Sequence, residues 1–96
     1  MQKYEMLLLL RSDMEEEARE AELKKYADIV TGMGGTVDAT DKWGVKKLQY
    51  PIAFKSDAFY ALMTFHADGA AVKELDRIAG ISDDVLRRMI TKVEEK

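Results

Sequence analysis

The chain has 96 residues, enough for one small hydrophobic core, so we expect a single domain over residues 1–96. Hydrophobic residues make up 47% of the sequence, which is typical of globular proteins and argues against a disordered chain. There is no cysteine, which excludes disulfides and thiolate metal sites. The net charge is −3, which by itself argues mildly against a nucleic-acid partner.

The acidic side chains are concentrated in one segment. From Asp13 to Asp28 the sequence has seven acids and three bases, whereas the remainder has eleven acids and twelve bases. Outside that segment the net charge is therefore +1, and the overall value decides little about partners.

The first predicted element is a strand from Lys3 to Arg11. Apolar side chains alternate onto both faces, with Tyr4, Met6, Leu8 and Leu10 on one and Leu7 and Leu9 on the other. This pattern is typical of a central strand covered on both sides. Its apolar run of five residues is too short for a membrane span or a signal peptide, so we expect a cytoplasmic protein with no membrane partner.

A helix should follow this strand. The sequence Ser12-Asp13-Met14-Glu15 has the S-x-x-E form of a capping box, which predicts a helix start. Leu23, Ala27 and Val30 then form an apolar stripe at helical spacing. The glycines at 32, 34 and 35 should end the helix.

Two further strands are predicted. Val37–Ile52 should be extended and bent at Gly44, and its proline at 51 indicates an edge strand. A turn at Lys55–Asp57 should lead into the aromatic-rich strand Ala58–His66.

The remaining elements are a helix and a strand. Asp68 can cap the second helix, and Gly80 should end it. Its inner face should carry Val72, Leu75, Ile78 and Ala79. Val85–Val93 should be the last strand, where Arg88 lies between two apolar residues on the same face. A bulge, or a place at the sheet margin, would accommodate that arginine.

The predicted order β-α-β-β-α-β is the signature of an α+β, ferredoxin-like split βαβ sandwich. Two helices should cover one face of a four-stranded antiparallel sheet and leave the other face open. Strands one and three should be central, and strands two and four should be edges.

Catalysis has little support in these residues. His66 is the single histidine, and a lone histidine at a strand end is ordinarily a surface or satisfied residue. The acids Glu15–Glu17 are most simply a solvated helix start. The glycines at 32–35 follow a helix, the reverse of a phosphate-binding loop. We therefore expect no enzyme activity, no metal, no cofactor and no small-molecule substrate.

The basic and aromatic residues allow two interpretations. Lys42, Lys46, Lys47 and Lys55 cluster around the second and third strands, and Arg87, Arg88 and Lys92 form a second group. Such charges either protect sheet edges from aggregation or contact RNA phosphates. Trp43 and Tyr50 either close the core or contact a partner, whereas Met63 and Met89 are candidate contacts on the open face.

Four segments resemble one known family. They are KYE at 3–5, GGTV at 34–37, WGVKKLQYPI at 43–52 and VLRRMI at 85–90. In order and spacing they resemble bacterial small-subunit ribosomal protein six over essentially the whole chain. The block from Trp43 to Ile52 is the most specific element.

This resemblance implies a ferredoxin-like fold and a structural role in the small ribosomal subunit. It implies binding to the central domain of small-subunit rRNA together with small-subunit ribosomal protein eighteen. The RNA-binding candidates are Lys3, Lys42, Lys46, Lys47, Arg87, Arg88 and Lys92. The candidates for contact with the protein partner are Trp43, Tyr50 and Met89.

Two other functions are compatible with the same architecture. One is a regulatory domain that senses a small metabolite at a dimer interface. The other is a phosphate-ester or acyl-phosphate hydrolase, which needs an anion-cradling loop with an arginine near strand one. Arg11 follows that strand, but no such loop follows Arg11.

Overall fold

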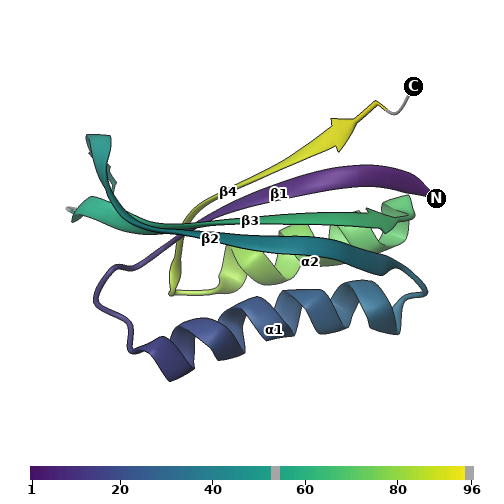
Figure 1. Cartoon of the computed structure of the whole chain (residues 1–96), viewed down its shortest axis with the longest axis horizontal. Coiled ribbons are helices and arrows are strands. Elements are labelled where there is room, and N and C mark those ends of the chain that lie inside the picture. Colours follow the sequence, from purple (N-terminus) through teal and green to yellow (C-terminus); the bar gives the residue numbers. More distant parts are fainter. Residues whose placement is uncertain (53–54, 95–96) are drawn as a thin grey trace.

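A computed structural model describes residues 1–52 and 55–94. Its elements are β1 (Gln2–Leu10), α1 (Glu16–Gly32), β2 (Thr36–Ile52), β3 (Lys55–Ala67), α2 (Gly69–Ile81) and β4 (Val85–Val93). This is the predicted β-α-β-β-α-β order. Figure 1 shows both helices on one side of the sheet, with no layer of the chain on the other side.

The sheet has the strand order β2-β3-β1-β4, and every neighbouring pair is antiparallel. The prediction that β1 and β3 are central and that β2 and β4 are edges is therefore confirmed. The ferredoxin-like fold class is confirmed with it. The start of β1 and the end of β4 lie at one end of the sheet, and the β2–β3 hairpin curls away from the helices at the opposite end (Figure 1).

The core lies between the sheet and the helices. Alternate residues of β1 and β3 point into it, because successive strand side chains point to opposite faces. Its largest fully buried side chains are Met6, Leu8 and Leu10 of β1, Phe65 of β3, Tyr26 and Val30 of α1, and Leu75 of α2. Met63 also belongs to this core and is only 2% exposed. The prediction that Met63 lies on the open face is wrong, because the register places it opposite Met6.

The other face of β1 is not covered by a helix. Leu7 and Leu9 lie on this open face, opposite Leu62 and Tyr60 of β3. The prediction of cover on both sides of β1 is therefore wrong, although Leu9 is only 5% exposed. Its neighbours on β3 and β4 shield Leu9 even without a second layer.

The start of α1 differs from the prediction. Glu15 occupies the N-cap position without a side-chain cap hydrogen bond, and Ser12 lies outside the helix. The Ser12 hydroxyl instead donates to Asp57 Oδ1 at 2.7 Å. The Ser12 hydroxyl, which the capping-box pattern predicts to cap the helix, is thus hydrogen-bonded to a residue 45 positions away in sequence. The predicted cap of α2 is confirmed, since Asp68 Oδ1 accepts from the Ala71 N–H at 3.0 Å.

The glycines at the end of α1 allow a close approach of the chain to β3 before β2 begins. Gly32 is the last helical residue, and Gly34 has a φ of 85°, which favours glycine. At Gly35 an added Cβ would lie 2.5 Å from the His66 carbonyl oxygen and 2.8 Å from Val30 Cγ1. Only glycine fits between the helix and β3 at that point.

The β2–β3 hairpin extends beyond the helices. The predicted turn at Lys55–Asp57 is wrong, because these residues already belong to β3. Lys55 pairs with Ile52 of β2, and Asp57 pairs with Lys47 of β2. The register shifts between Lys42 and Gly44, which leaves Trp43 as an extra residue. Gly44 follows with a φ of 89°, so the predicted bend is a bulge.

The bulge on the first part of β4 explains how Arg88 is accommodated. Leu9 pairs with Arg87 and Leu10 with Val85, so the residue between them, Leu86, is extra. Arg88 faces the helix side at the sheet margin, where its Nε donates to Asp76 Oδ1 of α2 at 2.9 Å. Val85 and Ile90, rather than Leu86, pack against the core. Helix α2 continues one residue past the predicted end at Gly80.

Candidate interface on the hairpin and the open sheet face

An aromatic and basic stack lies where the hairpin leaves the sheet. The rings of Trp43 and Tyr60 are stacked, with centroids 6.3 Å apart and planes 17° from parallel. Lys46 Nζ lies 5.1 Å from the Trp43 centroid and 6.0 Å from that of Tyr60. The bulge at Trp43 turns its ring toward Tyr60, which lies on the open face. The stack therefore presents an exposed aromatic surface beside a cation.

Two adjoining pockets form a groove on the open face beside this stack. They have volumes of about 160 and 270 Å³ and share Leu9, Tyr60 and Arg87 as lining residues. The first pocket reaches Leu7 and Met89, and the second reaches the hairpin at Leu48–Tyr50. We call the two together the open-face groove. The half next to Leu7 and Met89 has mostly apolar walls, the half next to the hairpin has mixed walls, and the Arg87 guanidinium lines both.

The three predicted protein-contact residues are all on the surface. Trp43 is 45% exposed, Tyr50 is 72% exposed and Met89 is 46% exposed. Tyr50 and Met89 line the two halves of the open-face groove, and Trp43 lies in the adjacent stack. Because these side chains are so exposed, we expect that closing the core is not their main role. The structure brings the three to one side of the sheet.

Some of the predicted RNA-binding cations form ion pairs within the chain, and others do not. Lys42 faces the helix side and forms an ion pair with Glu20, and Arg88 forms one with Asp76. Lys55, a further member of the basic cluster, lies 3.8 Å from Asp13. In the part of the chain that the structure describes, Lys46, Lys47 and Arg87 have no ion pair and lie at the hairpin end of the sheet, with Lys46 on the open face and Lys47, opposite Asp57, on the other face.

Lys3 and Lys92 lie at the opposite end of the sheet. They occupy neighbouring positions on β1 and β4 but point to opposite faces, since Lys92 pairs with Tyr4 on the helix side and Lys3 pairs with Val93 on the open face. The structure therefore does not bring all seven predicted cations together. The hairpin end collects three without ion pairs, and the terminal end collects two.

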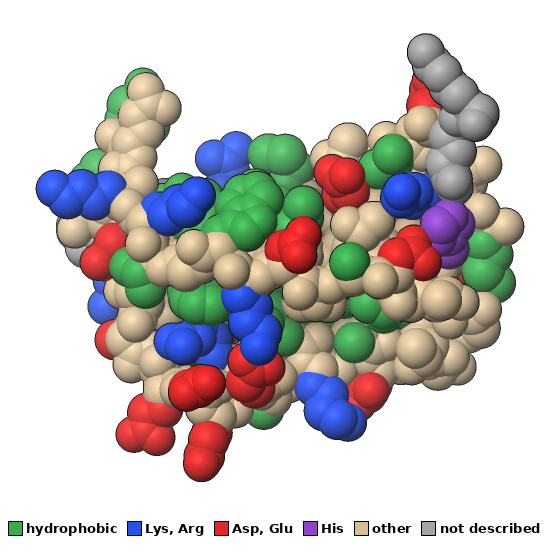
Figure 2. Space-filling view, viewed as in Figure 1, with side chains coloured by type: hydrophobic (Ala, Val, Ile, Leu, Met, Phe, Trp, Pro, Cys, Tyr) green, Lys and Arg blue, Asp and Glu red, His purple; other side chains and the backbone are tan. Residues whose placement is uncertain are grey.

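Many of the acidic side chains are on α1, although Glu5 and Asp41 lie on the open face. Figure 2 shows several red side chains along the edge of the molecule formed by α1, with blue side chains both among them and at the hairpin end and further red side chains near the sheet. Glu16 and Glu17 occupy the first turn of α1. The molecule thus has an acidic helix side and a more basic hairpin end, as the uneven charge distribution in the sequence predicts.

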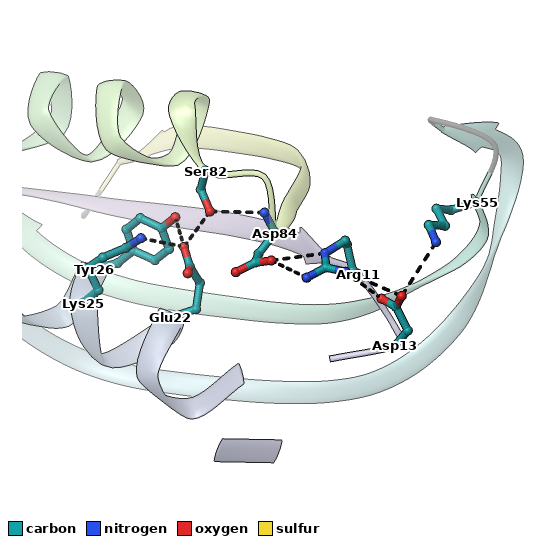
Figure 3. A network of polar contacts seen from close by, with 8 residues as sticks. All are labelled: Arg11, Asp13, Glu22, Lys25, Tyr26, Lys55, Ser82 and Asp84. Atoms are coloured by element: carbon teal, nitrogen blue, oxygen red, sulfur yellow. Dashed lines mark hydrogen bonds and ion pairs between the residues drawn. The ribbon is translucent and has the colours of Figure 1, made fainter. Parts of the chain in front are cut away.

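Arg11 is held by two carboxylates. Its Nε and Nη2 donate to Asp84 Oδ1 at 3.1 and 2.5 Å, and its Nη1 donates to Asp13 at 3.3 Å (Figure 3). The hydrogen bond to Asp84 is the largest of the effects that raise the pKa of Arg11. With two carboxylates on its guanidinium, Arg11 does not form the anion-binding site that a phosphate-ester hydrolase needs.

A buried polar network joins α1 to the loop before β4. Oε1 of Glu22 accepts from the hydroxyls of Tyr26 at 2.6 Å and Ser82 at 2.9 Å, and it lies 2.8 Å from Lys25 Nζ (Figure 3). Burial alone would raise the pKa of Glu22, but these hydrogen bonds outweigh burial and lower it. Burial and the bond to Glu22 raise the pKa of Tyr26.

The sequence analysis missed this network. The spacing of Glu22 and Tyr26, one helical turn apart on the inner side of α1, was the available signal. Its partner Ser82 lies 60 positions further on, so the sequence gives no local indication of the third member.

His66 contacts an acidic side chain of the neighbouring strand. Its Nδ1 lies 2.6 Å from Asp38 Oδ2 on the neighbouring strand. Within residues 1–52 and 55–94, no group of three His, Cys, Asp or Glu side chains is placed to hold a metal ion. Over the same residues, no helix is long and apolar enough to cross a membrane.

Comparison with known proteins identifies one family. The family model described as "Ribosomal protein S6" matches residues 3–92. The chain is 43% identical over 95 residues to "Small ribosomal subunit protein bS6" of Exiguobacterium sibiricum, covering 99% of this chain and 100% of that protein. It is 41% identical over 96 residues to the protein of the same name from Micrococcus luteus, covering 100% of this chain and 95% of that protein.

A solved structure supports the fold. The crystal structure of 30S ribosomal protein S6 from Thermotoga maritima superposes with a TM-score of 0.90. The match covers 96% of this chain and 87% of that one, at 22% sequence identity. At that identity the likeness supports the arrangement of strands and helices, and the sequence matches carry the family assignment.

Proposed function

The chain belongs to the ribosomal protein S6 family, and on that premise we propose that it binds the central domain of small-subunit rRNA jointly with small-subunit ribosomal protein eighteen. Family membership makes it a structural component of the small ribosomal subunit in the cytoplasm, not an enzyme. The joint binding of RNA and protein is the proposal.

One observation carries this proposal. Exposed apolar side chains lie beside Lys46 and Arg87, two cations without ion pairs among the described residues, at the hairpin end of an uncovered sheet face. Large aromatic side chains such as Trp43 and Tyr50 are typical anchors of protein interfaces. Lysines such as Lys46 and Lys47 are suited to phosphate contacts. A surface that has both is suited to a site where RNA and a protein meet.

The modest charge of this surface supports dependence on a partner. Each neutralised phosphate adds to RNA affinity through counterion release, so a surface with few free cations binds weakly by itself. Two of the seven predicted cations, Lys42 and Arg88, already have carboxylate partners within the chain. A second protein adds its own cations and orders a joint surface, and the coupling between the two proteins is reciprocal.

We assign separate roles to the two kinds of residue. Lys46 and Lys47 contact phosphates from the hairpin, and Lys3 and Lys92 are available for a second phosphate contact at the other end. Trp43, Tyr50 and Met89 contact the protein partner. The acidic side of α1 faces away from the RNA, because phosphates and carboxylates repel each other.

Co-sedimentation with ribosomal subunits tests this proposal. The tagged protein, expressed in a bacterial cell at native level, should sediment with small subunits and not with large subunits or free protein. A variant with both Trp43 and Tyr50 changed to alanine should shift toward the top of the gradient. Sedimentation of the wild-type protein as a free monomer would contradict the proposal.

A further inference from the structure

We propose that the loop at 11–13, between β1 and α1, is a positioning element for the β2–β3 hairpin, and that the Ser12 hydroxyl makes its main contact. By holding the base of the hairpin, this loop fixes the direction in which the hairpin leaves the sheet and so presents Lys46 and Lys47 to RNA. The role in RNA binding rests on the proposed function, whereas the positioning of the hairpin does not.

The base of the hairpin is a two-stranded ribbon. β1 pairs with β3 as far as Leu10, which lies opposite Phe59, so residues 55–58 of β3 pair with β2 alone. The pairing with β2 is itself interrupted, since the register shifts between Lys47 and Ile52. Two paired strands without a third neighbour are only marginally stable in water. The direction of the hairpin therefore depends on contacts from outside the sheet.

The loop supplies such contacts directly after the pairing of β1 ends. The Ser12 hydroxyl donates to Asp57 Oδ1 at 2.7 Å. Asp13 Oδ2 lies 3.8 Å from Lys55 Nζ (Figure 3). Both hairpin residues face the helix side, because they alternate in step with the core residue Phe59. The loop thus meets the ribbon on the side opposite the aromatic stack.

This loop can hold the hairpin because it is itself fixed to the body of the domain on both sides of Ser12. Arg11 donates its backbone N–H to the Asp84 carbonyl at 3.0 Å, and its guanidinium donates to the Asp84 carboxylate (Figure 3). Met14 is buried in the core, and its carbonyl accepts from Arg19 Nη1 at 3.3 Å. Ser12 therefore connects the hairpin to a segment that the rest of the domain holds in place.

Of the two contacts, the hydrogen bond from Ser12 contributes more. The Asp13 side chain is 56% exposed, and an exposed ion pair such as the one with Lys55 is weak and screened by salt. The hydrogen bond to Asp57 is shorter and partly buried, and its acceptor is a carboxylate, which makes it stronger than a bond between neutral groups. Asp57 also lies directly opposite Lys47, one of the two proposed phosphate contacts.

Distances between spin labels in the protein without RNA test the positioning. The chain has no cysteine, so Gln49→Cys on the hairpin and Glu17→Cys on α1 provide one defined pair of labels. We compare this protein with its Ser12→Ala, Ser12→Thr and Ser56→Ala variants by pulsed electron paramagnetic resonance. Ser56→Ala is the matched control, because Ser56 is exposed and points to the other face from its neighbour Asp57.

We expect a single narrow distance distribution in the parent protein, in S12T and in S56A, and a broader distribution in S12A. A second pair of labels at Glu17 and Lys73, exposed positions on α1 and α2, should keep one distance in all variants. An unchanged hairpin distribution in S12A would overturn the inference, as would equal broadening in S56A. A changed distance between the two helices in S12A would also overturn it, because Ser12 would then hold the whole domain and not the hairpin.

Binding of the unlabelled protein to the rRNA central domain, with small-subunit ribosomal protein eighteen present, tests the role in RNA binding. One hydrogen bond changes an equilibrium by about two- to tenfold, so Kd should rise by that factor in S12A and return to the wild-type value in S12T. A broader hairpin distribution with unchanged Kd would contradict this role. If the wild-type protein does not bind the rRNA, the proposed function is wrong, and the label distances still decide whether Ser12 positions the hairpin.

Discussion

At the scale of single residues, Glu22 shows how one buried carboxylate connects two elements. It accepts hydrogen bonds from Tyr26 of the same helix and from Ser82 at the end of α2. These bonds and the nearby Lys25 ammonium satisfy the buried charge, which would otherwise be costly in the core. Removing the carboxylate would leave two hydroxyls without an acceptor.

The lowered pKa of Glu22 predicts a specific acid sensitivity. Because the pKa is lower in the folded state, the carboxylate stabilises the fold above its unfolded pKa of about 4.3, and this contribution is lost as the pH falls through the folded value. The free energy of unfolding should therefore fall less steeply below pH of about 5 in Glu22→Gln than in the wild type. Urea midpoints between pH 7 and pH 3 measure this, and parallel curves would contradict it.

Truncation to alanine should affect partner binding at Tyr50 and the free energy of unfolding at Tyr26. Tyr50 is 72% exposed, so Tyr50→Ala should change the free energy of unfolding by less than about 0.5 kcal/mol. The same change should weaken binding to the protein partner about tenfold. Tyr26 is fully buried, and Tyr26→Ala should destabilise the fold by about 3–5 kcal/mol. Thermal melts and partner titrations give both values, and a Tyr50→Ala variant that unfolds would show that this ring closes the core.

At the scale of elements, the alternation of apolar residues and the positions of glycine and proline were enough to predict all six helices and strands. They fix which face of each strand is apolar, and Pro51 identifies β2 as an edge. The errors came from contacts between distant segments. Ser12 has the local pattern of a helix cap, but Asp57 lies close enough to accept its hydroxyl. Met63 has an ordinary alternating position, and only the register with β1 shows that it faces the helices.

The two glycines at the end of α1 should respond oppositely to alanine. Gly32 is helical and has no atom within 4 Å of an added Cβ, so Gly32→Ala should stabilise the protein by about 0.4–1 kcal/mol. An added Cβ at Gly35 would meet the backbone of His66 and the side chain of Val30. Gly35→Ala should therefore destabilise the fold by about 2–4 kcal/mol. Denaturant unfolding of the pair tests the packing of α1 against β3, and similar stabilities would contradict it.

The hairpin should contribute to RNA binding through its two lysines without ion pairs. Changing Lys46 and Lys47 together to alanine should lower the salt slope of assembly on rRNA by up to about two units. Lys42→Ala is the matched control, because Lys42 faces the helix side and pairs with Glu20. Its slope should stay at the wild-type value. If the double variant also keeps that slope, the two lysines only protect the edge strand.

At the scale of the whole molecule, the sequence predicted the fold and the family, but only part of the site. Charge counts could not show that Lys42 and Arg88 are engaged by Glu20 and Asp76, since these partners lie on helices distant in sequence. The bulge at Trp43 was equally hidden, although it turns the indole toward Tyr60. The open-face groove depends on the register of four strands, so no linear pattern could predict it.

The arrangement of charge over the molecule indicates how the assembly is organised. Helix α1 carries many of the acidic side chains, the hairpin end has three cations without ion pairs among the described residues, and the open face has a groove with apolar walls beside the charged side chains Glu5, Asp41 and Arg87. Under the proposed function, we expect RNA at the hairpin end and the protein partner on the adjacent face. Neither surface is large in charge or area, so the two partners should bind cooperatively.

The most direct test of this account is a titration of the isolated rRNA central domain with this protein, with and without small-subunit ribosomal protein eighteen. We predict weak binding by the protein alone and at least about tenfold tighter binding when the partner is present. The partner's own RNA affinity should rise by the same factor. Equal and tight affinity in both titrations would contradict the account, because this chain would then bind its RNA site without a partner.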